Sequence, residues 1–166
     1  MELSEQIQAD LKNFLKTGKT FEVGVLRMAI AALHNREIEK RIKLSKSEPL
    51  EKLDELSKLS EEEVIATISS EIKKRREAII EYEKGKRQDL ADREKKEIEI
   101  LQKYLPEQLS EEEIKKLAKE AIKKIGAEEP KDMGKVMAEL MPKVKGKADG
   151  SLVSKIVKDF LTPKNE

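Results

Sequence analysis

The sequence predicts an all-helical protein, and three observations lead to that prediction. Lys, Glu, Leu and Ile dominate the chain of 166 residues, a composition that favours helices. Apolar residues recur at helical spacing, and no segment shows the alternation typical of a strand. Two segments, Ser60-Glu61-Glu62-Glu63 and Ser110-Glu111-Glu112-Glu113, have the pattern of a capping box at a helix start. We therefore expect an N-terminal bundle of long helices, followed by a small C-terminal three-helix domain.

The first two helices should form the centre of the N-terminal domain. The first is expected over residues 2–16, where apolar side chains make one stripe. Thr20 can cap the second helix, which is apolar on most sides over residues 23–33. Beyond this segment the helix becomes polar, and Ile38 and Ile42 continue the apolar stripe.

Residues 45–60 break the helical pattern. Several Ser residues and Pro49 interrupt the segment, and Leu50, Leu53 and Leu56 allow two turns of helix between the breaks. We interpret this segment as a mobile connection.

Two long helices follow, expected over residues 60–85 and 89–105. They should be antiparallel neighbours because the connection between them is short. The first carries the basic run Lys73-Lys74-Arg75-Arg76. Such a run on a Glu-rich helix is typical of a solvated face with ion pairs between successive turns, and a polyanion contact is the alternative.

Pro106 stops the helical pattern. It divides the chain into an N-terminal domain, residues 1–106, and a C-terminal domain, residues 107–166. Three helices are expected in the C-terminal domain, over residues 110–126, over residues 132–141 and from Ser151 onward.

A basic segment between the last two helices is the candidate binding site. Lys143, Lys145 and Lys147 lie on a loop that Gly146 makes flexible, and Ser151 can cap the helix that follows. Lysines beside a helix N-terminus suit an anion, above all a phosphate. The predicted nucleic-acid-binding residues are Lys135, Lys143, Lys145, Gly146, Lys147, Ser151 and Lys155.

The sequence offers no catalytic or metal-binding pattern. The single histidine, His34, is best explained as a packing or surface residue, and there is no cysteine. No phosphate-binding loop of the nucleotide-binding type and no activated nucleophile can be identified. We therefore expect no catalytic residue, no metal and no cofactor.

Composition and targeting patterns add an expectation about location. The absence of cysteine is compatible with a reducing cytosol. The N-terminus lacks the pattern of a signal peptide, and the longest apolar run, residues 28–33, is too short to span a bilayer. We expect a cytoplasmic protein without a membrane partner. The net charge of +1 predicts nothing about a polyanionic partner, so local charge has to decide.

Several segments resemble the YqeY-like family over nearly the whole chain. They are Val25-Leu26-Arg27-Met28, Asp89-Leu90-Ala91, Tyr104-Leu105-Pro106-Glu107-Gln108-Leu109 with the capping box after it, Met133-Gly134-Lys135-Val136-Met137 and Val144-Lys145-Gly146-Lys147-Ala148-Asp149-Gly150. One departure is the segment at about residues 46–59, which is longer than the usual link in the family.

The resemblance implies a function. The family is similar to the C-terminal tail of GatB, the B subunit of the tRNA-dependent amidotransferase, and related domains are fused to some glutaminyl-tRNA synthetases. In those proteins the domain is an all-helical accessory module that contacts the outer corner of tRNA, while the chemistry resides elsewhere. The implied function is a tRNA-binding module linked to tRNA-dependent amide transfer, a carbon–nitrogen ligation with glutamine as amido donor.

Two alternatives stay open. The chain could be a protein-docking module for an aminoacyl-tRNA synthetase or an amidotransferase. It could also be an independent amide-transfer enzyme, although the glutaminase and kinase-like active sites of the amidotransferase have no counterpart here. Any amidotransferase label would come from the resemblance to GatB. The scarcity of aromatic residues, 3% of the chain, argues against stacking on single-stranded nucleic acid.

Overall fold

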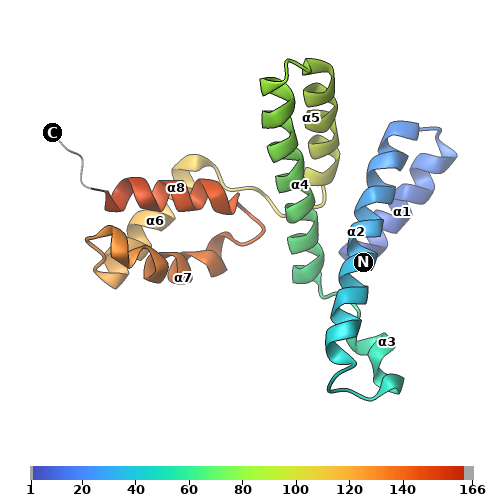
Figure 1. The fold of residues 1–166 in the computed structure, drawn as a ribbon, viewed down its shortest axis with the longest axis horizontal. Coiled ribbons are helices and arrows are strands. Elements are labelled where there is room, and N and C mark those ends of the chain that lie inside the picture. Colours follow the sequence, from blue (N-terminus) through green and yellow to red (C-terminus); the bar gives the residue numbers. More distant parts are fainter. Residues whose placement is uncertain (1, 163–166) are drawn as a thin grey trace. The chain divides into compact units, whose positions relative to one another are not determined.

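The computed structural model describes residues 2–162, and within them it contains helices and turns but no strand (Figure 1). The all-helical prediction is therefore confirmed. The chain forms two compact units, Met1–Leu105 and Pro106–Glu166, here called the N-terminal and C-terminal units. None of the helices in the described range has both the length and the apolar surface needed to cross a membrane.

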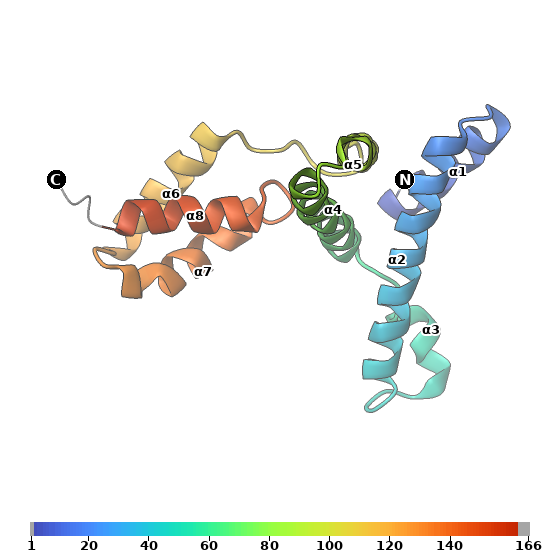
Figure 2. The same ribbon diagram turned by 45° about the horizontal axis from the view of Figure 1, so that its top comes forward.

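The N-terminal unit begins with two helices that lie side by side, α1 (Leu3–Lys16) and α2 (Thr20–Leu44) (Figures 1 and 2). Ile7 and Leu26 are completely buried in the core of this unit. Thr20 does not cap α2, because it is the first helical residue and the N-cap position belongs to Lys19. The chain turns sharply at Gly18, whose φ of 70° is in the left-handed region that glycine favours.

The C-terminal half of α2 does not continue the buried stripe as expected. Ile38 and Ile42 are 41% and 58% exposed. Lys40, on another face of the helix, donates hydrogen bonds to the carbonyl oxygen of Lys58 at 2.8 Å and to Glu63 at 2.7 Å. The neighbouring segments therefore cover the Lys40 face of α2 and leave the isoleucine face open.

The segment after α2 is partly helical and lies along the end of α2 (Figure 1). It forms a 3-10 turn, Leu50–Lys52, and the short helix α3 (Leu53–Leu56). Leu53 is buried, and Asp54 pairs with Arg41 of α2. The predicted turns of helix are present, and the segment has contacts that a free linker would lack.

The remaining helices of this unit, α4 (Glu61–Lys84) and α5 (Gln88–Gln102), form the expected hairpin. The Ser60 capping box is present, with both of its hydrogen bonds. Helix α5 ends three residues earlier than expected. Tyr104 is buried beyond that end, and its hydroxyl donates to Asp10 of α1 at 2.8 Å. Burial, together with this hydrogen bond, raises the pKa of Tyr104.

Over the residues that the structure describes, the C-terminal unit has three helices around its own core. They are α6 (Glu111–Ile125), α7 (Met133–Val144) and α8 (Gly150–Leu161), and a 3-10 turn, Pro130–Asp132, precedes α7. The Ser110 capping box is present, and Gly126 ends α6 in the left-handed conformation. The core residues with the lowest exposure are Ala118, Ala121, Val136, Leu140, Val153 and Val157. The predicted three-helix arrangement is therefore confirmed.

Candidate nucleic-acid interface

Helix α7 extends further than the sequence suggested, and this changes the position of Lys143. Pro142 lies inside the last turn of the helix, which ends at Val144. Proline removes one backbone donor, but the Lys145 amide still bonds to the Met141 carbonyl at 2.9 Å. The Val144 side chain is buried in the core, which favours the extra turn. Lys143 is therefore a helix residue and does not lie on the loop.

The loop itself is a tight turn, residues 145–149, which we call the basic turn. The backbone amides of Lys147 and Ala148 both bond to the Val144 carbonyl, at 2.9 and 3.0 Å. Gly146 has a φ of 76°, a conformation that is strained for any residue with a Cβ atom. The turn thus closes over a buried valine and places two lysines on either side of a glycine.

Ser151 does not cap α8, in contrast to the prediction. The N-cap is Asp149, whose carboxylate accepts a hydrogen bond from the Ser151 amide at 2.8 Å. Asp and Ser are similarly good caps, and Asp149 comes first along the chain, so the helix starts at Gly150. The carboxylate occupies one of the free amides at this terminus, which makes the terminus a poorer anion site than expected.

The predicted lysines differ in their ionic partners. On α7, the Lys135 amine lies 3.3 Å from Asp132, and the Lys143 amine lies 3.7 Å from Glu139. Lys145 and Lys147 are exposed, and no carboxylate of the described residues is close enough to form an ion pair with either.

Lys155 lies close to the start of α6. The pKa of Glu111 is lowered, mainly by a hydrogen bond from Lys115 and in smaller part by the positive charge of Lys155. Of the predicted lysines, Lys145 and Lys147 in the basic turn are therefore the two whose charge is least compensated by acidic neighbours.

The structure also shows two residues that sequence reasoning did not assign to the site. The Gln108 side chain donates to the Gly146 carbonyl at 2.9 Å, and the Leu109 amide donates to the Lys147 carbonyl at 2.7 Å. The only available signal was that both segments carry the family resemblance. Spacing could not reveal this contact, because 38 residues separate Gln108 from Gly146.

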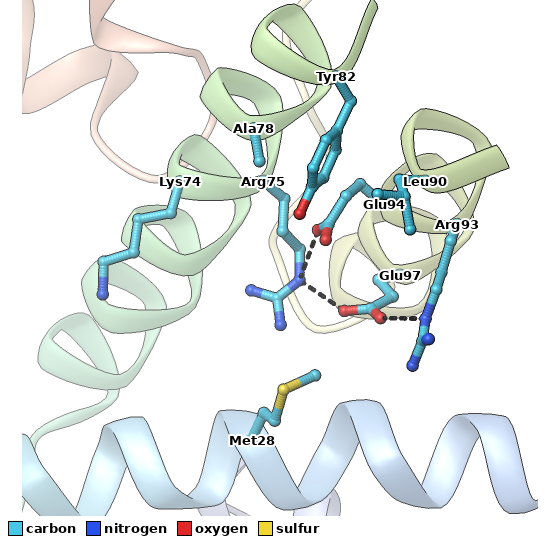
Figure 3. Close-up of a pocket in the computed structure, with 9 residues that line it drawn as sticks. All are labelled: Met28, Lys74, Arg75, Ala78, Tyr82, Leu90, Arg93, Glu94 and Glu97. Carbon is cyan, nitrogen blue, oxygen red and sulfur yellow. Dashed lines mark hydrogen bonds and ion pairs between the residues drawn. The ribbon is translucent and has the colours of Figure 1, made fainter. Parts of the chain in front are cut away.

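A second group of charges lies in the N-terminal unit, around a hollow of about 400 Å³ between α4, α5 and α2 (Figure 3). Arg75, whose side chain is 8% exposed, donates to Glu97 of α5 at 3.0 Å and to Glu71 of its own helix at 3.0 Å. Figure 3 shows Glu94 and Glu97 turned toward the Arg75 guanidinium, with Arg93 on the other side of Glu97. We call these residues the Arg75 cluster. Interpreting Arg75 as part of a solvated face was therefore wrong.

The cluster accounts for two opposite pKa shifts. Burial raises the pKa of Glu94, and repulsion from Glu97 adds to that increase. Burial also acts to raise the pKa of Glu71, but hydrogen bonds from Lys74 and Arg75 outweigh it, and the net shift is downward. In the described residues no group of three His, Asp or Glu side chains could hold a metal ion. These charges therefore connect α4 to α5, and the basic turn remains the better candidate for a ligand.

Comparison with known proteins places the chain in one family. No curated protein matches the sequence. The family model described as Yqey-like protein matches residues 4–161, which is nearly the whole chain. The chain therefore belongs to the YqeY-like family.

Proposed function

We propose that this protein is a tRNA-binding accessory module, linked to tRNA-dependent amide transfer and without a catalytic site of its own. The observation that carries the proposal is the basic turn. Lys145 and Lys147 are exposed on a hydrogen-bonded turn, and no carboxylate of the described residues pairs with them.

The chemistry of the turn suits the backbone of a folded RNA. Lysines on a loop contact phosphate charge and do not read sequence. Folded RNA is recognised mostly through its shape, phosphates and 2′-hydroxyls, for which no aromatic platform is needed. The resemblance to the GatB tail favours the outer corner of tRNA as the contact. A lysine that is not neutralised within the protein can release counterions when it meets a phosphate, and this gives binding a marked salt dependence.

Binding of tRNA to the full chain across a series of salt concentrations tests the proposal. We expect Lys145→Ala/Lys147→Ala to lower the slope of log K against log salt by about 1.4 to 1.8 units, because each lysine accounts for roughly 0.7 to 0.9. Adding Lys143→Ala should lower the slope by less than one further lysine, because Glu139 already lies near Lys143.

The matched control is Lys12→Ala/Lys16→Ala on α1, which makes the same change in net charge at two exposed lysines. Circular dichroism should show unchanged helicity in both double variants. If the basic-turn variant remains folded and keeps the affinity and the slope of the wild type, the basic turn is not the RNA site. Duplex DNA, measured in parallel, shows whether the binding is selective for folded RNA.

One observation favours the second candidate, a protein-docking module. Ile38 and Ile42 expose large apolar side chains one turn apart on α2. Association with a purified glutaminyl-tRNA synthetase or amidotransferase that persists at high salt, together with no binding of tRNA, would favour docking over RNA binding.

A further inference from the structure

The segment that leads into the C-terminal unit is hydrogen-bonded to the basic turn through Gln108. The amide nitrogen of this side chain donates to the Pro106 carbonyl at 2.7 Å and to the Gly146 carbonyl at 2.9 Å. A carboxamide nitrogen carries two hydrogens, so these two bonds use both of them. The side chain therefore joins the backbone of its own segment to the middle of the basic turn.

A second bond lies immediately beside the first. The Leu109 amide donates to the Lys147 carbonyl at 2.7 Å. Two consecutive carbonyls of the turn, those of Gly146 and Lys147, are thus held by the 108–109 segment. On the inner side, the Val144 carbonyl accepts hydrogen bonds from two amides of the turn.

These bonds restrict the backbone that carries the two lysines. The direction of a side chain follows from the orientation of its backbone, and Gly146 lies between Lys145 and Lys147. Glycine in the left-handed region can readily adopt other conformations, so a turn built around it needs bonds from outside to remain in one. The Gln108 bond acts at this flexible residue.

We propose that Gln108 is a positioning residue that holds the basic turn in one conformation, so that Lys145 and Lys147 face the phosphates of the bound RNA. This inference rests on the proposed function for the identity of the ligand. Gln108 is uncharged and contributes no counterion release of its own. Its loss should weaken binding through the added cost of ordering the turn, without a change in the number of phosphates contacted.

Two substitutions separate the hydrogen bond from the bulk of the side chain. Gln108→Met keeps the length and the lack of charge but removes both donors, whereas Gln108→Ala also removes the bulk. Gln102→Ala is the matched control, because Gln102 is exposed on α5 and makes no side-chain hydrogen bond within the described residues. All variants are made in the full chain. Gln108 is exposed, so the fold should tolerate its loss.

Two measurements are made on each variant: hydrogen exchange of the amides in residues 145–149, and the affinity for tRNA across a salt series. We expect both Gln108 variants to exchange faster in the basic turn and to bind tRNA about 2- to 10-fold more weakly, which is the range of one hydrogen bond. The slope of log K against log salt should stay at the wild-type value. This separates a positioning role from loss of the lysines, which lowers the slope.

The possible outcomes distinguish the inference from the function on which it rests. Unchanged exchange in the basic turn would overturn the inference, whatever the RNA result. Faster exchange with unchanged tRNA affinity would overturn the positioning role, because the lysines would then bind equally well from a loose turn. If the wild type fails to bind tRNA while the variants exchange faster, the proposed function fails and the hold of Gln108 on the turn is supported.

Discussion

The tripeptide Lys-Gly-Lys joins two helices in each unit, but the two copies present different charges. In the α4–α5 turn, Lys84 lies 2.7 Å from Glu81, and the guanidinium of Arg87 makes two bonds of 3.1 Å to Asp89. In the basic turn, neither lysine has an acidic partner among residues 2–162. In the α4–α5 turn Lys84 and the following Arg87 are paired, whereas Lys86 has no ion pair among residues 2–162. The two copies of the tripeptide therefore differ at their first lysine, which has an acidic partner only in the α4–α5 turn.

The backbones of the two turns also differ. In the basic turn the glycine takes the left-handed conformation, whereas in the α4–α5 turn Gly85 has a φ of −78° and Lys86 takes the left-handed conformation, with a φ of 55°. The same three letters therefore specify neither the same turn nor the same surface. The flanking residues decide: Glu81, one helical turn earlier, pairs with Lys84, and Asp89 pairs with Arg87, the residue that follows the tripeptide. Lys84 and Arg87 at the α4–α5 turn are therefore paired within their own unit, whereas both lysines of the basic turn lack an ion pair within the described residues.

The largest expected effect is on stability, and it tests whether ion pairs in the N-terminal unit hold its helices together. Arg75→Ala removes the main partner of Glu97, whose side chain is only 6% exposed, and should lower the free energy of unfolding by about 3–5 kcal/mol. Urea denaturation of the full chain measures this change. The control is Lys73→Ala, which removes an exposed pair at 4.0 Å and should cost less than about 1 kcal/mol. Equal costs for the two variants would contradict a structural role for the Arg75 cluster.

An intermediate effect, on the salt dependence of tRNA binding, should follow if the paired cations of the α4–α5 turn lose their acidic partners. Glu81→Gln/Asp89→Asn removes the carboxylates beside Lys84 and Arg87. If local pairing is the main difference between the turns, the salt slope for tRNA should rise, by at most about 1.8 units for two freed cations.

Glu5→Gln/Glu120→Gln makes the same change in net charge at two exposed acids on α1 and α6 and should leave the slope unchanged. A double variant at the α4–α5 turn that behaves like this control would show that the two turns differ in more than their ionic partners.

The smallest expected effect concerns Glu94. The pKa of Glu94 is raised in the folded state, so the folded protein binds a proton at this carboxyl group more tightly than the unfolded chain does. That difference destabilises the fold progressively as the pH rises from the unfolded pKa through the folded one. Glu94→Gln should therefore raise the unfolding temperature at pH 7.

The gain from Glu94→Gln should disappear below about pH 4, where the carboxyl group is protonated in both states. Thermal unfolding at the two pH values checks this. A gain of the same size at both would show that charge is not its cause.

The helices could be predicted because their signals are local. Each capping box needs only a serine and the glutamate three residues later, and both boxes, at Ser60 and Ser110, occur where expected. Most of the core of the C-terminal unit could be predicted from stripes of apolar residues, because helical spacing is also a local signal. The errors at Pro142 and Ser151 came from competition between local signals, because a buried Val144 outweighed a proline and Asp149 preceded the serine as a cap.

Features that depend on distant partners could not be predicted. Arg75 looks like any lysine or arginine of a solvated run until α5 brings Glu97 beside it. Ile38 belongs to an apolar stripe by spacing, but it is 41% exposed. In the candidate site, the lysines are visible in the sequence, whereas the segment that holds their turn is visible only after folding has joined it to them.

The hydrogen bond between Tyr104 and Asp10 has a consequence for how the chain acquires its structure during synthesis. The two residues are 94 positions apart, and Tyr104 is the last buried residue of its unit. Helix α1 is made first but meets this partner last, because the tyrosine must leave the ribosome before the bond can form. The N-terminal unit therefore cannot be completed before the residues that immediately precede Pro106 have been synthesised.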